Sequence, residues 1–118
     1  MERGEVYLVN VDFLESVWLR GEGSRAKYLV CLQGDGAFSH PESVAVVIAS
    51  SDRRGGTPLR AFEVSVGPDH GFDHDTIIDC RLVYSLSRER FPAEPALVLS
   101  SDVMEEIDTA LIVGLQMY

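Results

Sequence analysis

The feature that most constrains the fold is a series of short segments rich in β-branched and aromatic residues, separated by turn-forming residues. They recur at roughly ten-residue spacing, which predicts a small barrel or sandwich of short strands. The expected strands cover residues 6–12, 27–33, 43–50, 60–66, 76–86 and 96–99. The segment 43–50 is the most apolar and is suited to burial on both faces, so we expect it to be the central strand.

The last segment has a helical period instead. Ser101 or Asp102 can cap a helix, and Glu105 completes a capping-box pattern with Asp102. The apolar residues at helical spacing, expected to face the core, are Val103, Ile107, Ala110, Leu111, Gly114, Leu115 and Tyr118. The apolar residues left on the outer face, which is typical of a subunit or partner contact, are Ile112, Val113 and Met117. The fold class is therefore mainly β, with one amphipathic C-terminal α-helix.

Length and composition limit the class of protein. A chain of 118 residues with 46% hydrophobic residues can form one domain, here residues 1–118, with its own core. The longest apolar run, residues 44–49, is too short to cross a bilayer, and no export signal is present, so we expect a cytoplasmic protein without membrane contact. Cys31 and Cys80 lie in apolar segments and are interpreted as buried, reduced thiols rather than a disulfide.

The net charge of −9 argues against a general nucleic-acid coat, because binding of phosphate requires cations. The basic residues are nevertheless clustered, which leaves room for a small basic cleft. Arg20, Arg25 and Lys27 surround the end of a long first loop, and Ser50 and Ser51 end the central strand. Guanidinium groups and hydroxyls together suit a phosphate, which favours an anion site. Taken by itself, however, the pattern is more often explained by ordinary surface ion pairs and strand-end capping.

Other patterns are less specific. Residues 69–75 hold two histidines among acids, but their glycines and proline favour a solvated acidic loop over a metal site. Ser50 or Ser51 with a distant histidine could form a hydrolase triad, yet no G-x-S-x-G surrounds them. Trp18, in the first long loop of residues 14–24, is either a plug for the barrel mouth or a stacking surface for a base.

Six motifs, in order along nearly the whole chain, resemble the MazF/PemK family of toxin endoribonucleases. The opening RGEVYLV at residues 3–9 resembles the family's Gly-acidic pair and first strand, and YLV at 28–30 its second. VVIASS at 46–51 resembles the strand that ends in a hydroxyl pair. The later motifs are GFDHDT at 71–76, TIIDCRLVYSLSR at 76–88 and the closing helix LSSDVMEEIDTALIVGL at 99–115.

This resemblance implies a small SH3-like β-barrel closed by the C-terminal helix, a homodimer, and inhibition by a cognate antitoxin. The implied activity is metal-independent, cofactor-free cleavage of single-stranded RNA by attack of the ribose 2′-hydroxyl on phosphorus. It implies that Arg25 and Ser50 are catalytic, with Arg25 stabilising negative charge because arginine stays protonated. The residues expected to bind RNA are Trp18, Arg20, Lys27, Ser51, Arg53, Arg54 and Arg81.

The chain also departs from the family pattern. The usual Arg-Pro before the second strand is Ala26-Lys27 here, so Arg25 comes one residue early and Lys27 is an alternative source of charge. The usual Asp-Gln pair of the long strand is Arg81-Leu82. The second hypothesis is therefore a divergent or non-catalytic member that binds a protein partner, such as a toxin that poisons gyrase.

Overall fold

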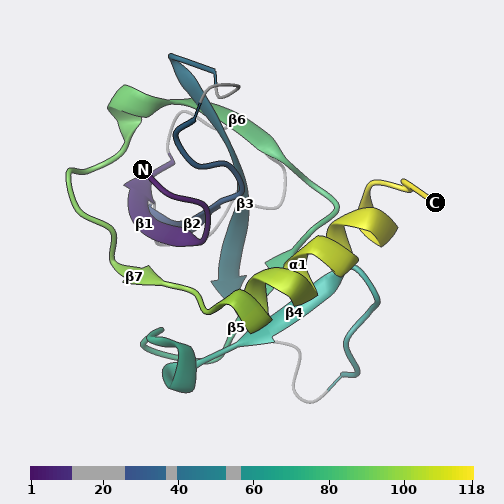
Figure 1. Cartoon of the computed structure of the whole chain (residues 1–118). Coiled ribbons are helices and arrows are strands. Elements are labelled where there is room, and N and C mark those ends of the chain that lie inside the picture. Colours follow the sequence, from purple (N-terminus) through teal and green to yellow (C-terminus); the bar gives the residue numbers. More distant parts are fainter. Residues whose placement is uncertain (12–25, 37–39, 53–56) are drawn as a thin grey trace.

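The computed structural model describes residues 1–11, 26–36, 40–52 and 57–118 (Figure 1). In these ranges seven strands form one antiparallel sheet, and a single α-helix follows them. The elements are β1 (Glu5–Asn10), β2 (Ala26–Cys31), β3 (Ser43–Ser51), β4 (Glu63–Val66), η2 (Pro68–His70), β5 (Thr76–Asp79), β6 (Tyr84–Ser87), η3 (Arg88–Arg90), β7 (Leu97–Val98) and α1 (Ser101–Gly114). The prediction of a mainly β chain with one C-terminal helix is confirmed.

Strand β3 is the centre of the sheet, as its apolar sequence predicts. The strands follow the order β4-β5-β3-β2-β1-β7, and β6 pairs with β3 beside β5. One edge of β3 pairs with β2, whereas the other edge is shared between β6 at its beginning and β5 at its end. Because β3 has partners on both edges and packs on both faces, four consecutive residues from Val46 to Ala49 are buried.

The prediction of one continuous strand over residues 76–86 is wrong. Ala49 pairs with Ile78, whereas Val46 pairs with Tyr84, so three steps along β3 correspond to six steps along the partner. The three extra residues leave the ladder, in the manner of a large bulge, and separate β5 from β6. Both halves still pair with β3, as a single long strand would. The bulge pushes Arg81 and its neighbours outward, and all three residues at 81–83 are exposed.

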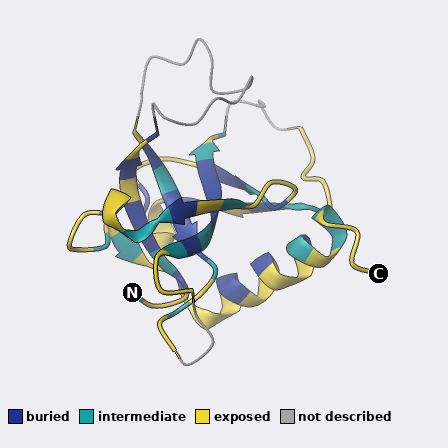
Figure 2. Cartoon of the chain, turned by 90° about the horizontal axis from the view of Figure 1, so that it is seen from above, coloured by how far each residue is buried: buried dark blue, intermediate teal, exposed yellow. Residues whose placement is uncertain are grey.

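The two faces of the sheet carry separate cores (Figure 2). The helix-side core lies between the sheet and α1 and includes Val6, Val30, Val47, Ala49, Val64, Val66, Phe72, Ile78, Cys80, Leu99, Val103, Met104, Ile107 and Ala110. The second core, on the other face, includes Tyr7, Val9, Val11, Leu29, Cys31, Val44, Val46, Ile48 and Leu86. The two thiols are free and buried, as predicted, one in each core.

The N-cap of helix α1 lies one residue before the first of the predicted caps. Ser100 is the N-cap: its backbone is extended, and its Oγ accepts a hydrogen bond from the Val103 amide at 3.3 Å. The expected caps, Ser101 and Asp102, lie inside the first turn instead. A serine with an extended backbone can accept a hydrogen bond from one of the amides that have no helical partner in the first turn. The cap therefore lies at Ser100, where the chain leaves β7.

The inner face of α1 is shorter than its sequence period indicates. Val103, Met104, Ile107 and Ala110 are buried against the sheet, and Figure 2 shows the buried side of the helix turned toward the strands. The helix ends at Gly114, so the predicted stripe does not continue: Leu115 is 41% and Tyr118 is 88% exposed. The prediction that these two residues face the core is wrong. Within the described ranges, no helix has the length and apolar character needed to cross a membrane.

Candidate nucleic-acid interface

Lys27 and Ser50 lie on the same face at one end of the sheet. Tyr28 of β2 pairs with Ala49 of β3, and the register continued by one residue brings Lys27 opposite Ser50. Opposite residues of an antiparallel pair point to the same face. Lys27 is only 9% exposed although it carries a charge. A cation this deeply buried raises the electrostatic potential around the neighbouring hydroxyl, which suits an anion.

The hydroxyl of Ser50 is buried without a hydrogen-bond partner. Its Oγ is the only buried side-chain oxygen or nitrogen in the described part of the chain for which no partner is found. A buried hydroxyl without a partner costs free energy, and in native proteins such a group is rare. The unused hydrogen-bonding capacity of Ser50 is therefore a positive sign of a ligand site.

A cavity of about 270 Å³ opens beside Ser50. Its floor comes from β3 and β5, and its rim comes from β4 and the bulge after β5. The residues that line it are Ile48, Ser50, Glu63, Ile77, Asp79, Arg81 and Leu82. The lining combines three apolar side chains with one hydroxyl, one guanidinium and two carboxylates. Apolar side chains of this kind give a flat base a surface to lie on, and the polar groups can orient it.

Arg81 is held at the rim of this cavity by three contacts. Its Nε and Nη2 donate to the two carboxylate oxygens of Asp79 at 3.1 and 2.7 Å, and its guanidinium lies 4.1 Å from the centre of the Phe62 ring. Burial opposes ionisation of Asp79, but the hydrogen bonds from Arg81 outweigh it and lower the pKa of that carboxyl. The arginine is thus oriented in advance, with its charge partly balanced.

Ser51 points to the opposite face from Ser50 and contacts a different set of side chains. Its Oγ lies 2.7 Å from Nε2 of His74, and Nδ1 of the same ring lies 2.7 Å from a carboxylate oxygen of Asp73. The pairing of Ser51 with Thr76 brings the loop before β5 to the end of β3. The sequence allowed a serine–histidine pair here but did not identify His74 as the histidine, because the pairing that joins residues 51 and 74 is not local.

The acidic loop at residues 69–75 is exposed except for Phe72, which is buried against Tyr28. The His70 ring accepts a hydrogen bond from the Gly67 amide at 3.1 Å, so it stabilises the turn. Among the residues that the structure describes, no three His, Cys, Asp or Glu side chains lie close enough together to hold a metal ion.

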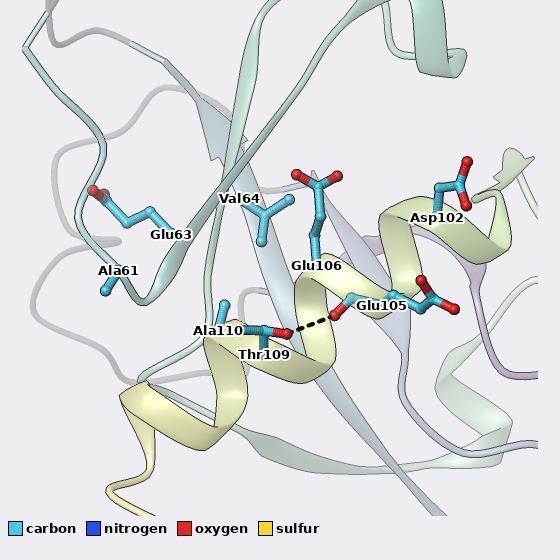
Figure 3. A pocket seen from close by; sticks show the side chains of 8 residues that line it. All are labelled: Ala61, Glu63, Val64, Asp102, Glu105, Glu106, Thr109 and Ala110. Atoms are coloured by element: carbon cyan, nitrogen blue, oxygen red, sulfur yellow. Dashed lines mark hydrogen bonds between the residues drawn. The ribbon is translucent and has the colours of Figure 1, made fainter.

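A second groove lies between β4 and α1 and has the wrong charge for RNA (Figure 3). Its volume is about 390 Å³, and carboxylates from both elements surround it. The residues that line it are Ala61, Glu63, Val64, Asp102, Glu105, Glu106, Thr109 and Ala110. Four carboxylates repel a phosphate backbone, so the cavity beside Ser50 is the better candidate for an RNA contact.

Several predicted site residues lie outside the described ranges, and their predicted roles remain predictions. They are Trp18, Arg20, Arg25, Arg53 and Arg54. Of the described residues, Ser50 and Arg81 line one cavity and Lys27 shares the face of Ser50, whereas Ser51 lies on the other face. Sequence reasoning did not name Asp79, which orients Arg81; its place two residues before an arginine at a strand end was the available signal.

The fold, with its candidate anion site at the end of the central strands, is consistent with the result of a comparison with known protein families. The model of the PemK-like, MazF-like toxins of type II toxin-antitoxin systems matches residues 2–115. The chain therefore belongs to this toxin family. No curated protein matches the chain in a sequence search.

Solved structures of the same fold include toxins from two bacterial groups. An endoribonuclease from a mycobacterial species, in complex with its cognate antitoxin, is 18% identical with a TM-score of 0.74, over 100% of this chain and 97% of that one. MazF from Deinococcus radiodurans is 16% identical with a TM-score of 0.74, over 99% and 97%. The Mycobacterium tuberculosis toxin MazF-mt6 is 14% identical with a TM-score of 0.70, over 95% and 96%.

Proposed function

We propose that this protein is a toxin endoribonuclease that cleaves single-stranded RNA without a metal ion or cofactor. Its family membership and its likeness to solved endoribonucleases support this activity. The observation that carries the proposal to particular residues is the unpartnered hydroxyl of Ser50, buried beside Lys27 and facing a cavity. A phosphate oxygen in that cavity would supply the hydrogen-bond partner that the fold does not.

The reaction requires attack of a ribose 2′-oxygen on the adjacent phosphorus and departure of the 5′-oxygen, leaving a cyclic phosphate. Negative charge increases on the phosphoryl oxygens during this step, so fixed donors and cations beside them lower the barrier. We assign hydrogen-bond donation to Ser50 and charge stabilisation to Lys27 and, from the family resemblance, Arg25. Arg81 at the rim is the candidate for a neighbouring phosphate or base.

The test is incubation of the purified protein with mixed-sequence RNA in the presence of EDTA. Wild type is expected to produce fragments that end in a cyclic phosphate. Ser50→Ala is expected to slow cleavage about a hundredfold, as is typical when one donor to developing charge is removed. Lys27→Gln and Arg25→Ala test the two candidate cations, one at a time.

The matched control is Ser85→Ala, which removes an exposed hydroxyl from β6 of the same sheet. It should cleave RNA at the wild-type rate. Intact RNA across many sequences, or a Ser50→Ala variant as active as wild type, would contradict the proposal. The second hypothesis, a protein-binding module, has less support because the solved relatives include endoribonucleases.

We further propose a cytoplasmic location, a homodimer and neutralisation by a cognate antitoxin. A toxin that acts on messenger RNA must reach it in the cytoplasm. Solved relatives include toxins in complex with an antitoxin. Addition of the cognate antitoxin is expected to stop RNA cleavage at one binding equivalent, and continued cleavage at that ratio would count against this partner.

A further inference from the structure

The side chains of Ser51, His74 and Asp73 form a continuous chain of contacts that the proposed RNA site does not use. The Ser51 hydroxyl lies 2.7 Å from Nε2 of the His74 ring, and Nδ1 of the ring lies 2.7 Å from the Asp73 carboxylate. Both ring nitrogens therefore contact side chains at hydrogen-bond distance. A hydroxyl, an imidazole and a carboxylate here follow one another in the order of a catalytic triad.

His74 differs from the other two histidines in what its ring contacts. Nδ1 of His40 accepts from the amides of Glu42 and Ser43, each at 3.1 Å, and Nδ1 of His70 accepts from the Gly67 amide. Those two rings stabilise turns of the backbone. Within the described residues the His74 ring contacts the side chains of Ser51 and Asp73, so its position serves the hydroxyl rather than a turn.

The chemistry of the three groups decides where the proton of the ring resides. An ionised carboxylate can only accept, so the Asp73 carboxylate, 2.7 Å from Nδ1, favours the tautomer of a neutral His74 ring that carries its proton on Nδ1. The lone pair of Nε2 then faces Ser51, and the hydroxyl donates to it. This tautomer is the one in which the ring can remove the proton of the serine.

We propose that Ser51 is an activated nucleophile that accepts an acyl group from small activated carboxylic esters. Its Oγ forms a bond to the carbonyl carbon, and the Oγ proton passes to Nε2 of His74. The bond to the ester's leaving oxygen breaks, that oxygen departs with the electron pair, and the proton on Nε2 passes to it or to solvent, so that the His74 ring is neutral again. Water then hydrolyses the acyl-serine, with His74 taking a proton from the water and returning one to Oγ, so that the serine is regenerated.

The exposed surroundings of Ser51 favour reaction with small esters and predict little selectivity between them. Ser51 is exposed, and the side chains of His74 and Asp73 are 49% and 68% exposed, so a small reagent reaches the hydroxyl without any opening of the fold. Neither the cavity beside Ser50 nor the groove between β4 and α1 is lined by Ser51 or His74. Ser51 also faces away from Ser50, because consecutive residues of a strand point to opposite faces. The proposed chemistry is therefore separate from RNA cleavage.

The test uses p-nitrophenyl acetate with the full-length protein and follows two signals, release of p-nitrophenolate and the mass of the acetylated peptide. Acetylation is expected at the peptide that contains Ser51. Ser51→Ala should abolish it, and His74→Asn should slow it about a hundredfold, the low end for a positioned base. Asp73 is a positioning residue: Asp73→Asn should slow the reaction about tenfold, and Asp73→Glu, which keeps the carboxylate, should restore part of the rate.

Two controls keep the test specific. Ser85→Ala removes another exposed serine and should react like wild type, and the urea-unfolded protein measures the background of unactivated groups. Because Ser51 and His74 are exposed, circular dichroism should give the same melting temperature for the variants and the wild type. Acetylation no faster than in the unfolded protein, acetylation at another residue, or an unchanged rate in His74→Asn would overturn the proposal. The readout does not involve RNA, so failure of one proposal leaves the other standing.

Discussion

At the scale of single residues, Ser50 shows how a candidate site departs from the rules that stabilise the rest of the fold. Buried side-chain nitrogen and oxygen atoms in the described structure have partners, with the hydroxyl of Ser50 as the exception. Its neighbour in the register is a lysine that is almost fully buried. The hydroxyl without a partner costs folding free energy, and the hydroxyl and the cation both suit an anion. Such costs are typical of residues retained for function.

Replacing Ser50 by alanine should therefore stabilise the protein while it slows RNA cleavage. Removal of a buried hydroxyl without a partner is expected to raise the free energy of unfolding by about 1 kcal/mol. Ser100→Ala is the opposite case: Ser100 caps α1, and its loss should lower that free energy by about 1 kcal/mol. Urea denaturation of both variants measures the difference. Equal destabilisation by the two substitutions would show that the Ser50 hydroxyl has a partner in solution.

At the scale of elements, the position of α1 depends on one close approach to the sheet. A Cβ added to Gly114, the last residue of α1, would lie 2.4 Å from the carbonyl oxygen of Cys80. The end of the helix thus lies directly on the chain that leaves β5, the place where the bulge begins. A glycine at this position lets the helix cover the helix-side core and reach the bulge that carries Arg81.

The prediction is that Gly114→Ala destabilises the fold. Alanine favours helix by about 1 kcal/mol, but the contact with Cys80 is with backbone, which must shift, and overpacking costs roughly 1–3 kcal/mol. We expect a net loss of about 1–2 kcal/mol by urea denaturation. Gly36→Ala is the matched control, because an added Cβ there meets nothing within 4 Å. A Gly114→Ala variant as stable as wild type would show that α1 and β5 separate easily.

The elements that the sequence predicted best are those whose signal is local. The apolar run of β3 and the helical period from Val103 to Ala110 each result from side chains near one another in the chain. The break between β5 and β6 could not be predicted, because three extra residues become visible only when both halves are aligned on β3. The same holds for the site. Ser50 was predicted from its strand end, whereas Asp79 and the contact of Ser51 with His74 depend on long-range pairing.

At the scale of the whole molecule, the two cores give the fold a shared sensitivity to alkaline pH. Burial raises the pKa of Cys31 to about 11 in the second core and of Cys80 to about 12 in the helix-side core. An exposed thiol in the unfolded chain ionises at lower pH, from a usual value near 9.0. The unfolded state therefore loses protons first, and the free energy of unfolding falls as the pH rises above about 9.

We expect thermal unfolding experiments to show a falling midpoint between about pH 9 and pH 11. Cys80→Ala would leave a cavity, so the better variant is Cys80→Val, which keeps an apolar side chain and removes one ionisable group. It should weaken the dependence on pH. A thiol reagent should modify both cysteines only after unfolding. Rapid modification of the folded protein at neutral pH, or a midpoint that does not change up to pH 11, would contradict this account.

The exposed apolar patch at the end of α1 predicts self-association of the whole molecule. Ile112 is 44%, Leu115 41% and Met117 66% exposed, and Leu82 and Val83 of the bulge are also exposed. Exposed apolar side chains of this kind are typical of a subunit interface. We therefore expect light scattering to give the mass of a dimer at micromolar concentration, and Ile112→Glu to give a monomer, because a buried charge without a partner opposes association.

Val98→Glu, on the edge strand β7 and 62% exposed, is the matched control and should remain a dimer. A monomeric wild type, or a dimer that tolerates Ile112→Glu as well as Val98→Glu, would place the interface elsewhere or remove it.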